Sequence, residues 1–137
     1  MTSFKVLVCG GRDFVDYEFL AKTLCTIHKV RPITLLVHGA ARGADSLAGE
    51  WADSRQIPVI EYPADWDRYG KRAGRIRNAF MLKDAKPHFV LAMPGGKGTA
   101  HMVRIARKAR VRVLAFDWNY NPISFVKEKI PEPAFDW

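Results

Sequence analysis

Residues 90–99 read VLAMPGGKGT, and this stretch decides the fold class of the chain. A short apolar segment runs into a turn rich in glycine, and helical periodicity begins near Thr99. Glycines let backbone N–H groups gather around an anion, and a helix that follows directs its positive dipole end to the same place. The stretch predicts a strand, a phosphate-binding turn and a helix, with ligand contacts from Pro94, Gly95, Gly96, Lys97, Gly98 and Thr99.

The rest of the chain alternates in the same way. Short apolar runs predict strands at residues 4–8, 33–37, 59–62, 89–93 and 111–116. Helical spacing of apolar residues predicts helices at 14–30, 44–54, 73–83 and 99–110, and a long connection covers 63–72. Strands joined through helices form parallel sheets, so we expect an α/β domain with a mainly parallel sheet of about five strands and helices on both faces.

Length and composition indicate one domain. The chain has 137 residues, of which 48% are hydrophobic and 26% charged, which is enough apolar material for one core. We expect residues 1–117 to form the domain. The proline-containing tail, residues 118–137, is expected to pack back on it through Phe125, Phe135 and Trp137.

Cysteine usage and hydropathy bear on the compartment. The two cysteines, Cys9 and Cys25, fall in a predicted strand and a predicted helix, which is typical of small buried side chains in a reducing environment. No apolar run approaches the roughly 20 residues of a membrane-spanning helix. We therefore expect a cytoplasmic protein with no membrane contact, no metal site and no cofactor.

Charge is distributed unevenly. The formal net charge is +8, and residues 85–116 contain no acidic side chain. Such a field attracts nucleotides or a nucleic-acid backbone. In the predicted helix 99–110, Arg104, Arg107 and Lys108 lie at helical spacing, which fits either a solvated face or a nucleic-acid contact.

Three predicted strands run into glycine-containing loops. These are Gly10-Gly11-Arg12, residues 39–45, and residues 94–99. Ligands of open parallel sheets bind outside the carboxyl ends of the strands, where such loops gather. None of the loops matches the dinucleotide fingerprint or the Walker A loop, so neither hydride transfer nor ATP hydrolysis is indicated.

Five ordered motifs carry a resemblance to a known family. They are Gly10-Gly11-Arg12, residues 38–45, Ala64-Asp65-Trp66, residues 73–78 and residues 94–99. Together they resemble the YspA-type, cpYpsA-related branch of the SLOG superfamily. The resemblance implies a Rossmann-like three-layer domain that binds a nucleotide or a nucleotide-derived ligand. SLOG relatives include the Lonely Guy phosphoribohydrolases, the DNA-processing protein A family and sensors of ADP-ribose-type signals, and many form homodimers.

The chain departs from the Lonely Guy motif at one decisive position. The motif reads Pro-Gly-Gly-x-Gly-Thr-x-x-Glu, and Met102 occupies the place of the glutamate. Methionine can neither transfer a proton nor stabilise a developing positive charge, so the resemblance argues against that hydrolase activity. The helical Arg-Lys pair of the same enzymes is matched by Arg77 and Asn78, and Arg77 is our first candidate for a phosphate contact.

The second glycine loop resembles the DNA-processing family. It contributes Gly39, Arg42, Gly43 and Asp45 as candidate ligand contacts. Asp45 is interpreted either as a ribose ligand or as the cap of the helix that begins near it. Arg42 faces either phosphate or solvent, and His38 is either a polar strand end or a catalytic group.

The long third connection supplies two further candidates. Trp66 is interpreted either as a stacking platform for a base or as part of a local core. Asp65 precedes it at the ligand edge and is the first carboxylate to consider for catalysis, ahead of Asp45 and His38.

Three hypotheses about function follow. The leading one is a module that binds a nucleotide-derived small molecule, of the ADP-ribose, cyclic ADP-ribose or nucleoside monophosphate type, for sensing or sequestration. The first alternative is a nucleotide hydrolase of the N-glycosidase kind, and the second is nucleic-acid binding through the basic residues 97–112. The resemblance also implies a homodimer.

Overall fold

The structure is a computed structural model that describes residues 2–123. Its elements are β1 (Lys5–Cys9), α1 (Tyr17–Val30), β2 (Leu35–His38), α2 (Ala44–Ser54), β3 (Val59–Glu61), α3 (Trp66–Tyr69), the 3₁₀ turn η1 (Gly70–Arg72), α4 (Ala73–Ala85), β4 (Phe89–Ala92), α5 (Lys97–Lys108) and β5 (Arg112–Ala115). The predicted alternation of strands and helices is confirmed.

The strands form one parallel sheet in the order β3-β2-β1-β4-β5. The chain moves outward from β1 in one direction through β2 and β3, and in the other direction through β4 and β5. The strand order therefore reverses between β1 and β4. In open parallel sheets the ligand crevice lies at such a reversal, outside the carboxyl ends of the strands.

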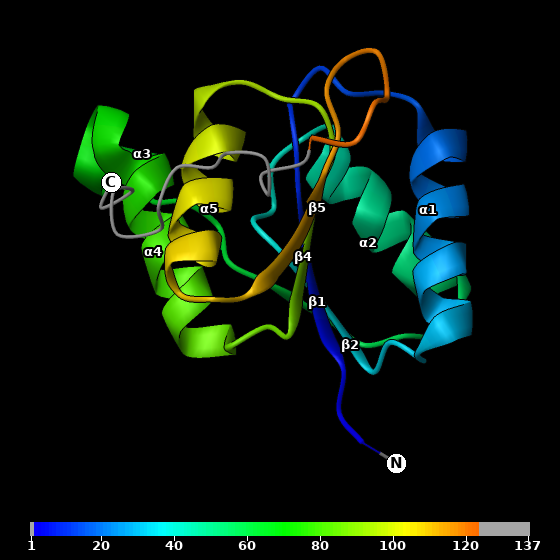
Figure 1. The fold of residues 1–137 in the computed structure, drawn as a ribbon. Coiled ribbons are helices and arrows are strands. Elements are labelled where there is room, and N and C mark those ends of the chain that lie inside the picture. Colours follow the sequence, from blue (N-terminus) through cyan, green and yellow to red (C-terminus); the bar gives the residue numbers. More distant parts are fainter. Residues whose placement is uncertain (1, 124–137) are drawn as a thin grey trace.

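Helices cover both faces of the sheet, as Figure 1 shows, with α1 and α2 on one side and α4 and α5 on the other. Side chains of a strand alternate between faces. Val6 and Val8 are fully buried against α1 and α2, while Leu7 and Cys9 are buried against α4 and α5. The expected three-layer α/β fold is confirmed, and β1 lies at its centre.

Two helix starts differ from the prediction. The first helix begins at Tyr17 rather than at residue 14, because the Asp16 carboxylate accepts a hydrogen bond from the Phe19 N–H (3.0 Å) and caps it there. The helix after β4 begins at Lys97, two residues before Thr99, and Gly96 is the N-cap residue that precedes it. The glycine turn after β4 is therefore shorter than expected.

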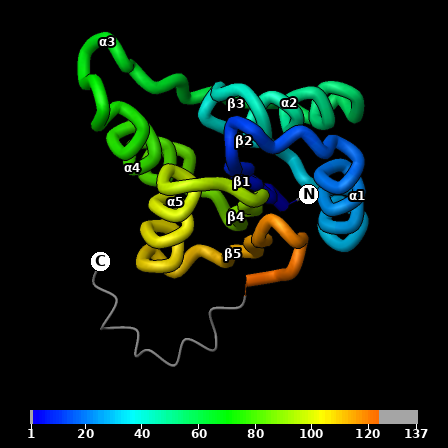
Figure 2. Tube along the Cα trace, turned by 90° about the horizontal axis from the view of Figure 1, so that it is seen from above, coloured from blue at the N-terminus to red at the C-terminus, as the bar shows by residue number. Residues whose placement is uncertain are grey.

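The third connection carries helical structure that the sequence did not predict. Residues Trp66–Tyr69 form α3, and Gly70–Arg72 form η1 immediately before α4. The Asp65 carboxylate caps α3 by accepting a hydrogen bond from the Arg68 N–H at 3.1 Å. None of the α3 residues is buried. Figure 2 shows that α3 stands out from the body of the domain beside α4.

The first residues of the tail pack against α1. The Tyr120 hydroxyl donates to the Asp16 carboxylate at 2.7 Å, and its ring stacks on Phe19 with a centroid distance of 4.2 Å. The remaining tail, with Phe125, Phe135 and Trp137, lies outside the described residues.

Candidate functional site

One glycine joins the three loops at the carboxyl edge. The Gly11 N–H donates to the carbonyl oxygen of Pro94 at 2.8 Å, and the Gly11 carbonyl accepts from the Ala44 N–H at 3.2 Å. The loops after β1, β2 and β4 are thereby held together by main-chain hydrogen bonds. Because the Gly11 N–H already donates to Pro94, it is not available to a ligand.

The glycines of these loops fall into two groups. A Cβ atom on Gly10 would lie 2.6 Å from the Ala44 Cβ and 2.8 Å from the Met93 Cβ, so only glycine fits there. Around Gly96 and Gly98, in contrast, a Cβ would meet nothing within 4 Å. The first group lets the loops pack closely, and the second leaves open space beside the start of α5.

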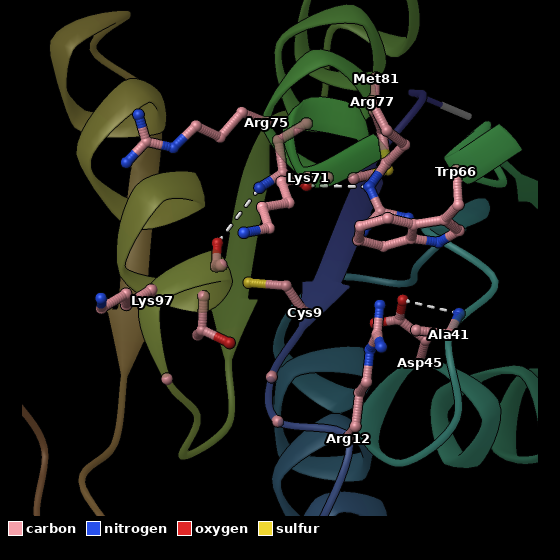
Figure 3. Close-up of a pocket in the computed structure, with 17 residues that line it drawn as sticks. Cys9, Arg12, Ala41, Asp45, Trp66, Lys71, Arg75, Arg77, Met81 and Lys97 are labelled. Carbon is pink, nitrogen blue, oxygen red and sulfur yellow. Dashed lines mark hydrogen bonds between the residues drawn. The ribbon is translucent and has the colours of Figure 1, made fainter. Parts of the chain in front are cut away.

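That open space belongs to a cavity of about 500 Å³ between α4, α5 and the loop after β1. We call it the basic cavity. Figure 3 shows Lys71, Arg75 and Lys97 on one side of it and Arg12 and Trp66 on the other. Among the predicted site residues, its walls include Gly10, Gly11, Arg12, Asp45, Trp66, Arg77, Asn78, Gly96, Lys97, Gly98 and Thr99.

Arg77 is anchored by the main chain of two other segments. Its Nη1 donates to the carbonyl oxygens of Gly39 (2.5 Å) and Tyr62 (3.3 Å), and its Nε donates to the Asn78 side chain at 2.9 Å. Burial lowers the pKa of Arg77, and the Asp45 carboxylate opposes that shift. Arg77 thus fixes a positive charge in the cavity wall and connects α4 to the loops after β2 and β3.

Asn78 connects α4 to the start of α5. Its amide nitrogen donates to the Gly98 carbonyl at 3.1 Å and lies 3.2 Å from Nδ1 of His101. Burial lowers the pKa of His101, and Arg75 and Arg104 add to this shift. Asn78 therefore holds the first turn of α5 in place at the edge of the cavity.

Asp45 shapes the loop before its own helix. Its Oδ2 accepts hydrogen bonds from the N–H groups of Gly39 (3.1 Å) and Ala41 (3.2 Å). The interpretation of Asp45 as a helix cap is wrong, because Gly43 precedes α2 and no side chain caps that helix. Burial raises the pKa of Asp45, against the opposing effects of the Ala41 hydrogen bond and of the charges on His38 and Arg77.

Trp66 lies across the cavity from α5. Its side chain is 46% exposed, so it does not fill a local core. The Arg12 guanidinium lies over its ring, 5.0 Å from the centroid. Such an arrangement is a cation–π contact, and at an exposed position it is worth about 0.5–1 kcal/mol.

His38 lies on the other face of the sheet. It is buried in a separate space of about 430 Å³, the acidic cavity, which is also lined by Ser46, Gly49, Glu50, Asp53 and Glu61. Its Nδ1 accepts the Ala40 N–H at 2.9 Å, and its Nε2 is 3.7 Å from Oε2 of Glu61. Burial lowers the pKa of His38, and the Asp45 and Glu61 carboxylates oppose that shift.

The other predicted site residues do not line the basic cavity. Asp65 caps α3, and its position is exposed. Gly39 and Arg42 line a smaller space, the side chamber, which adjoins the basic cavity. Arg42 pairs with Asp13 at 3.4 Å on the surface. The residues that do not line the basic cavity are therefore His38, Gly39, Arg42, Gly43, Asp65, Pro94 and Gly95.

Comparison with known proteins identifies the family of the chain. The profile of the YspA, cpYpsA-related SLOG family matches residues 4–69. The Gene 61 protein of Mycobacterium phage D29 is 35% identical over 120 residues, which cover 82% of this chain and 95% of that protein. The chain belongs to the YspA, cpYpsA-related SLOG family. No solved structure matches it significantly.

Membership of the SLOG family indicates a role in binding or processing a nucleotide-related ligand. In this SLOG chain the position of the Lonely Guy glutamate is inaccessible, because Met102 is fully buried among apolar residues of α4, α5 and the sheet. Cys9 does line the basic cavity, but burial raises the pKa of its thiol far above the usual range. The thiol is therefore neutral near pH 7 and a weak nucleophile.

Six residues in the wall of the basic cavity are not among the predicted site residues, namely Cys9, Ala41, Lys71, Gly74, Arg75 and Met81. Lys71, Arg75 and Met81 lie on the face of η1 and α4 that also carries Asn78, and Cys9 lies on the β1 face that carries Leu7. Helical spacing back from Asn78 leads to Arg75 and Lys71, at intervals of three and four residues. Strand alternation leads in the same way from Leu7 to Cys9.

The basic side chains in the second half of α5 lie outside the basic cavity. Arg104 and Arg107 are half-buried and Lys108 is exposed, and none of them lines the basic cavity. Within residues 2–123, no helix has the length and apolar character needed to cross a bilayer.

Proposed function

We propose that this protein binds a nucleotide-derived small molecule in the basic cavity, either to sense it or to sequester it. The observation that carries the proposal is the charge of the walls. Five cationic side chains line the cavity, namely Arg12, Lys71, Arg75, Arg77 and Lys97. The carboxylate among the lining side chains, Asp45, already accepts two main-chain hydrogen bonds. This excess of positive charge favours a phosphorylated ligand.

The start of α5 supports a phosphate at one end of the cavity. No side chain caps the helix at Gly96, so its first N–H groups have no side-chain acceptor, and residues 96–99 line the basic cavity. A phosphate can approach the main chain there, because a Cβ on Gly96 or Gly98 would itself meet nothing within 4 Å. The Lys97 side chain adds a positive charge at the same turn.

Trp66 supports the base of a nucleotide at the other side. Its half-exposed ring lines the cavity and faces the Arg12 guanidinium. Aromatic side chains that are held beside a cationic cavity stack on bases of any sequence. A nucleotide with its phosphate at α5 and its base at Trp66 satisfies both ends of the cavity.

Binding is favoured over cleavage by the places of the acidic groups. Glycosidic cleavage needs a carboxylate beside the departing base. Met102 is fully buried, Asp65 caps α3, and His38 faces the acidic cavity. In the described chain, the acid that remains at the basic cavity is Asp45, whose Oδ2 is held by the loop.

Calorimetry tests the proposal directly. We expect adenosine 5′-monophosphate and ADP-ribose to bind more tightly than about millimolar, and adenosine, which has no phosphate, to bind far more weakly. Lys97→Gln should weaken the phosphorylated ligands. The matched control is Arg112→Gln, which removes an exposed charge at the amino end of β5, away from the cavity. Absence of binding by any phosphorylated nucleotide would overturn the proposal.

A second measurement separates binding from hydrolysis. The protein is incubated overnight with adenosine and cytidine 5′-monophosphates and with ADP-ribose, and the products are separated by chromatography. Intact ligands support a binding protein. Release of free base or ribose phosphate shows an N-glycosidase and overturns the choice of binding over cleavage.

A further inference from the structure

The side chamber continues the basic cavity past Trp66. It has a volume of about 310 Å³ and shares Arg12, Ala41, Trp66 and Arg77 with the basic cavity. Its remaining walls come from the loops after β2 and β3. The two spaces are therefore neighbouring compartments of one site, with shared residues between them.

The pair formed by Arg12 and Trp66 stands between the compartments. Both side chains line both spaces, and the guanidinium lies 5.0 Å from the centroid of the ring. Figure 3 shows the two side chains facing each other beside Ala41 and Asp45. Both residues are exposed, and they come from a loop and from the short helix α3. This exposed contact is readily rearranged by a ligand that lies across both compartments.

The charged side chains that line the side chamber are all cationic. Its charged lining residues are Arg12, Arg42 and Arg77, and its described walls carry no carboxylate. Arg77 is held in place by the carbonyl oxygens of Gly39 and Tyr62. The pairing of Arg42 with Asp13 is exposed on both sides, so it competes only weakly with a phosphate.

Positive charge is thus concentrated at two places, with Trp66 between them. Lys71, Arg75, Lys97 and the start of α5 form one centre, which belongs to the basic cavity alone. Arg42, which lines only the side chamber, forms the other centre together with Arg77, which lines both spaces. A single terminal phosphate can occupy only one of them. Two adjacent phosphates, as in a nucleoside diphosphate, also remain together at one end.

We infer that the ligand carries two phosphate groups separated by a sugar, one in the basic cavity and one in the side chamber, with its base beside Trp66. This inference rests on the proposed function. A nucleoside 3′,5′-bisphosphate has this chemistry. The arginine fork of Arg42 suits the second phosphate, since it donates two parallel hydrogen bonds to one anion.

The test compares three probes by calorimetry: adenosine 5′-monophosphate, ADP and adenosine 3′,5′-bisphosphate. We expect the bisphosphate to bind at least about tenfold more tightly than either of the others, since one further charge-assisted bidentate contact is worth about a factor of ten or more. Equal affinities of ADP and the bisphosphate would overturn the inference, because total charge would then be sufficient.

A variant locates the second phosphate. Arg42→Gln should remove the advantage of the bisphosphate over the monophosphate, while Arg112→Gln should leave that advantage intact. An advantage that survives Arg42→Gln contradicts the side chamber as its source. If the monophosphate binds and the bisphosphate gains nothing, only this inference fails. If neither binds, the proposed function fails with it.

Discussion

The basic cavity and the acidic cavity are of similar size, about 500 and 430 Å³, but their linings have opposite charge. They share the loop after β2. Asp45 from this loop region lines the first cavity, and His38 at the end of β2 lines the second.

Side chains on opposite faces of the sheet line two cavities of opposite charge, because successive residues of a strand point to opposite faces. His38 is on the α2 face of the sheet, whereas Cys9 is on the α4 and α5 face. A histidine and three carboxylates, Glu50, Asp53 and Glu61, therefore gather where no cationic side chain is in the lining, and the cationic side chains gather opposite them. Of the residues that suggest catalysis in the sequence, His38 is thus separated from the basic cavity, whereas Asp45 lines it.

We expect the largest effect from substitution of Arg77, whose side chain connects the wall of the basic cavity to the loop after β2. Arg77→Met leaves the buried Gly39 carbonyl without its donor, so we expect the free energy of unfolding to fall by about 2–3 kcal/mol. Nucleotide binding should be lost as well. Denaturant unfolding and calorimetry measure the two effects, with Arg112→Met as the control. Wild-type stability in Arg77→Met would show that this anchor is dispensable.

Substitution of Gly10 and of Gly98 by alanine tests whether these two glycines have different packing roles. Gly10→Ala places a Cβ against Ala44 and Met93, and such overpacking should cost about 1–3 kcal/mol. Gly98→Ala meets no neighbour within 4 Å and adds a good helix former to α5, so stability should rise by roughly 0.5 kcal/mol. Denaturant titration compares them. Equal losses in both variants would contradict the division of the glycines into two groups.

Trp66→Ala separates ligand contact from folding. Loss of one stacking surface should weaken nucleotide binding by about tenfold, with a change in stability below roughly 0.5 kcal/mol, because the ring is half-exposed. Trp66→Tyr should retain most of the affinity. Trp118, which is 55% exposed and lines neither cavity, provides the control Trp118→Ala. A similar loss of affinity in Trp118→Ala would contradict stacking on Trp66.

The acidic cavity should give the smallest effect, a dependence of stability on pH. Burial lowers the pKa of His38, so below the ordinary histidine pKa the unfolded chain binds more protons than the folded one. Stability should therefore fall from about pH 7.5 to about pH 5.5. His38→Asn retains an acceptor for the Ala40 N–H but does not titrate, so its stability should fall less.

Asp45→Asn gives a complementary measurement, because the Asp45 carboxylate opposes the lowering of the His38 pKa. Burial raises the pKa of Asp45, so its contribution has the opposite sign: stability is lost as the pH rises through the pKa of the folded state. The pKa values of His88 and His101 are also lowered. Both histidines are present in the wild type and in each variant, so their contributions to the pH dependence cancel when the curves are subtracted. Parallel pH curves for wild type and His38→Asn would rule out a contribution from His38.

Much of the fold was predictable from sequence, because strand and helix periodicities are local. The glycine loops were correctly expected at one edge, since parallel strands bring their carboxyl ends together. The predicted end of α1 at Val30 was also correct. Its start was placed too early because Phe14 is apolar and fits the helical pattern, whereas the Asp16 cap starts the helix at Tyr17. The short helix α3 was missed because four residues are too few to show a period.

The site was harder to predict than the fold, because its contacts join distant segments. Nothing near Asp45 in the sequence indicates that its carboxylate turns back to Gly39 and Ala41 instead of capping α2. The two carbonyl partners of Arg77 likewise come from loops 38 and 15 residues away. Such partners depend on tertiary packing, which periodicity does not encode.

The arrangement of η1 and α4 has a consequence for the charge of the basic cavity. The side chains of Arg77 and Asn78 are tied to other segments, whereas those of Lys71 and Arg75 are exposed and make no hydrogen bond to a described residue. The fixed pair maintains the architecture, and the exposed pair can be exchanged at little cost in stability. Under the proposed function, substitution at these two exposed positions would change the charge that the basic cavity presents to a ligand, while the scaffold remains unchanged.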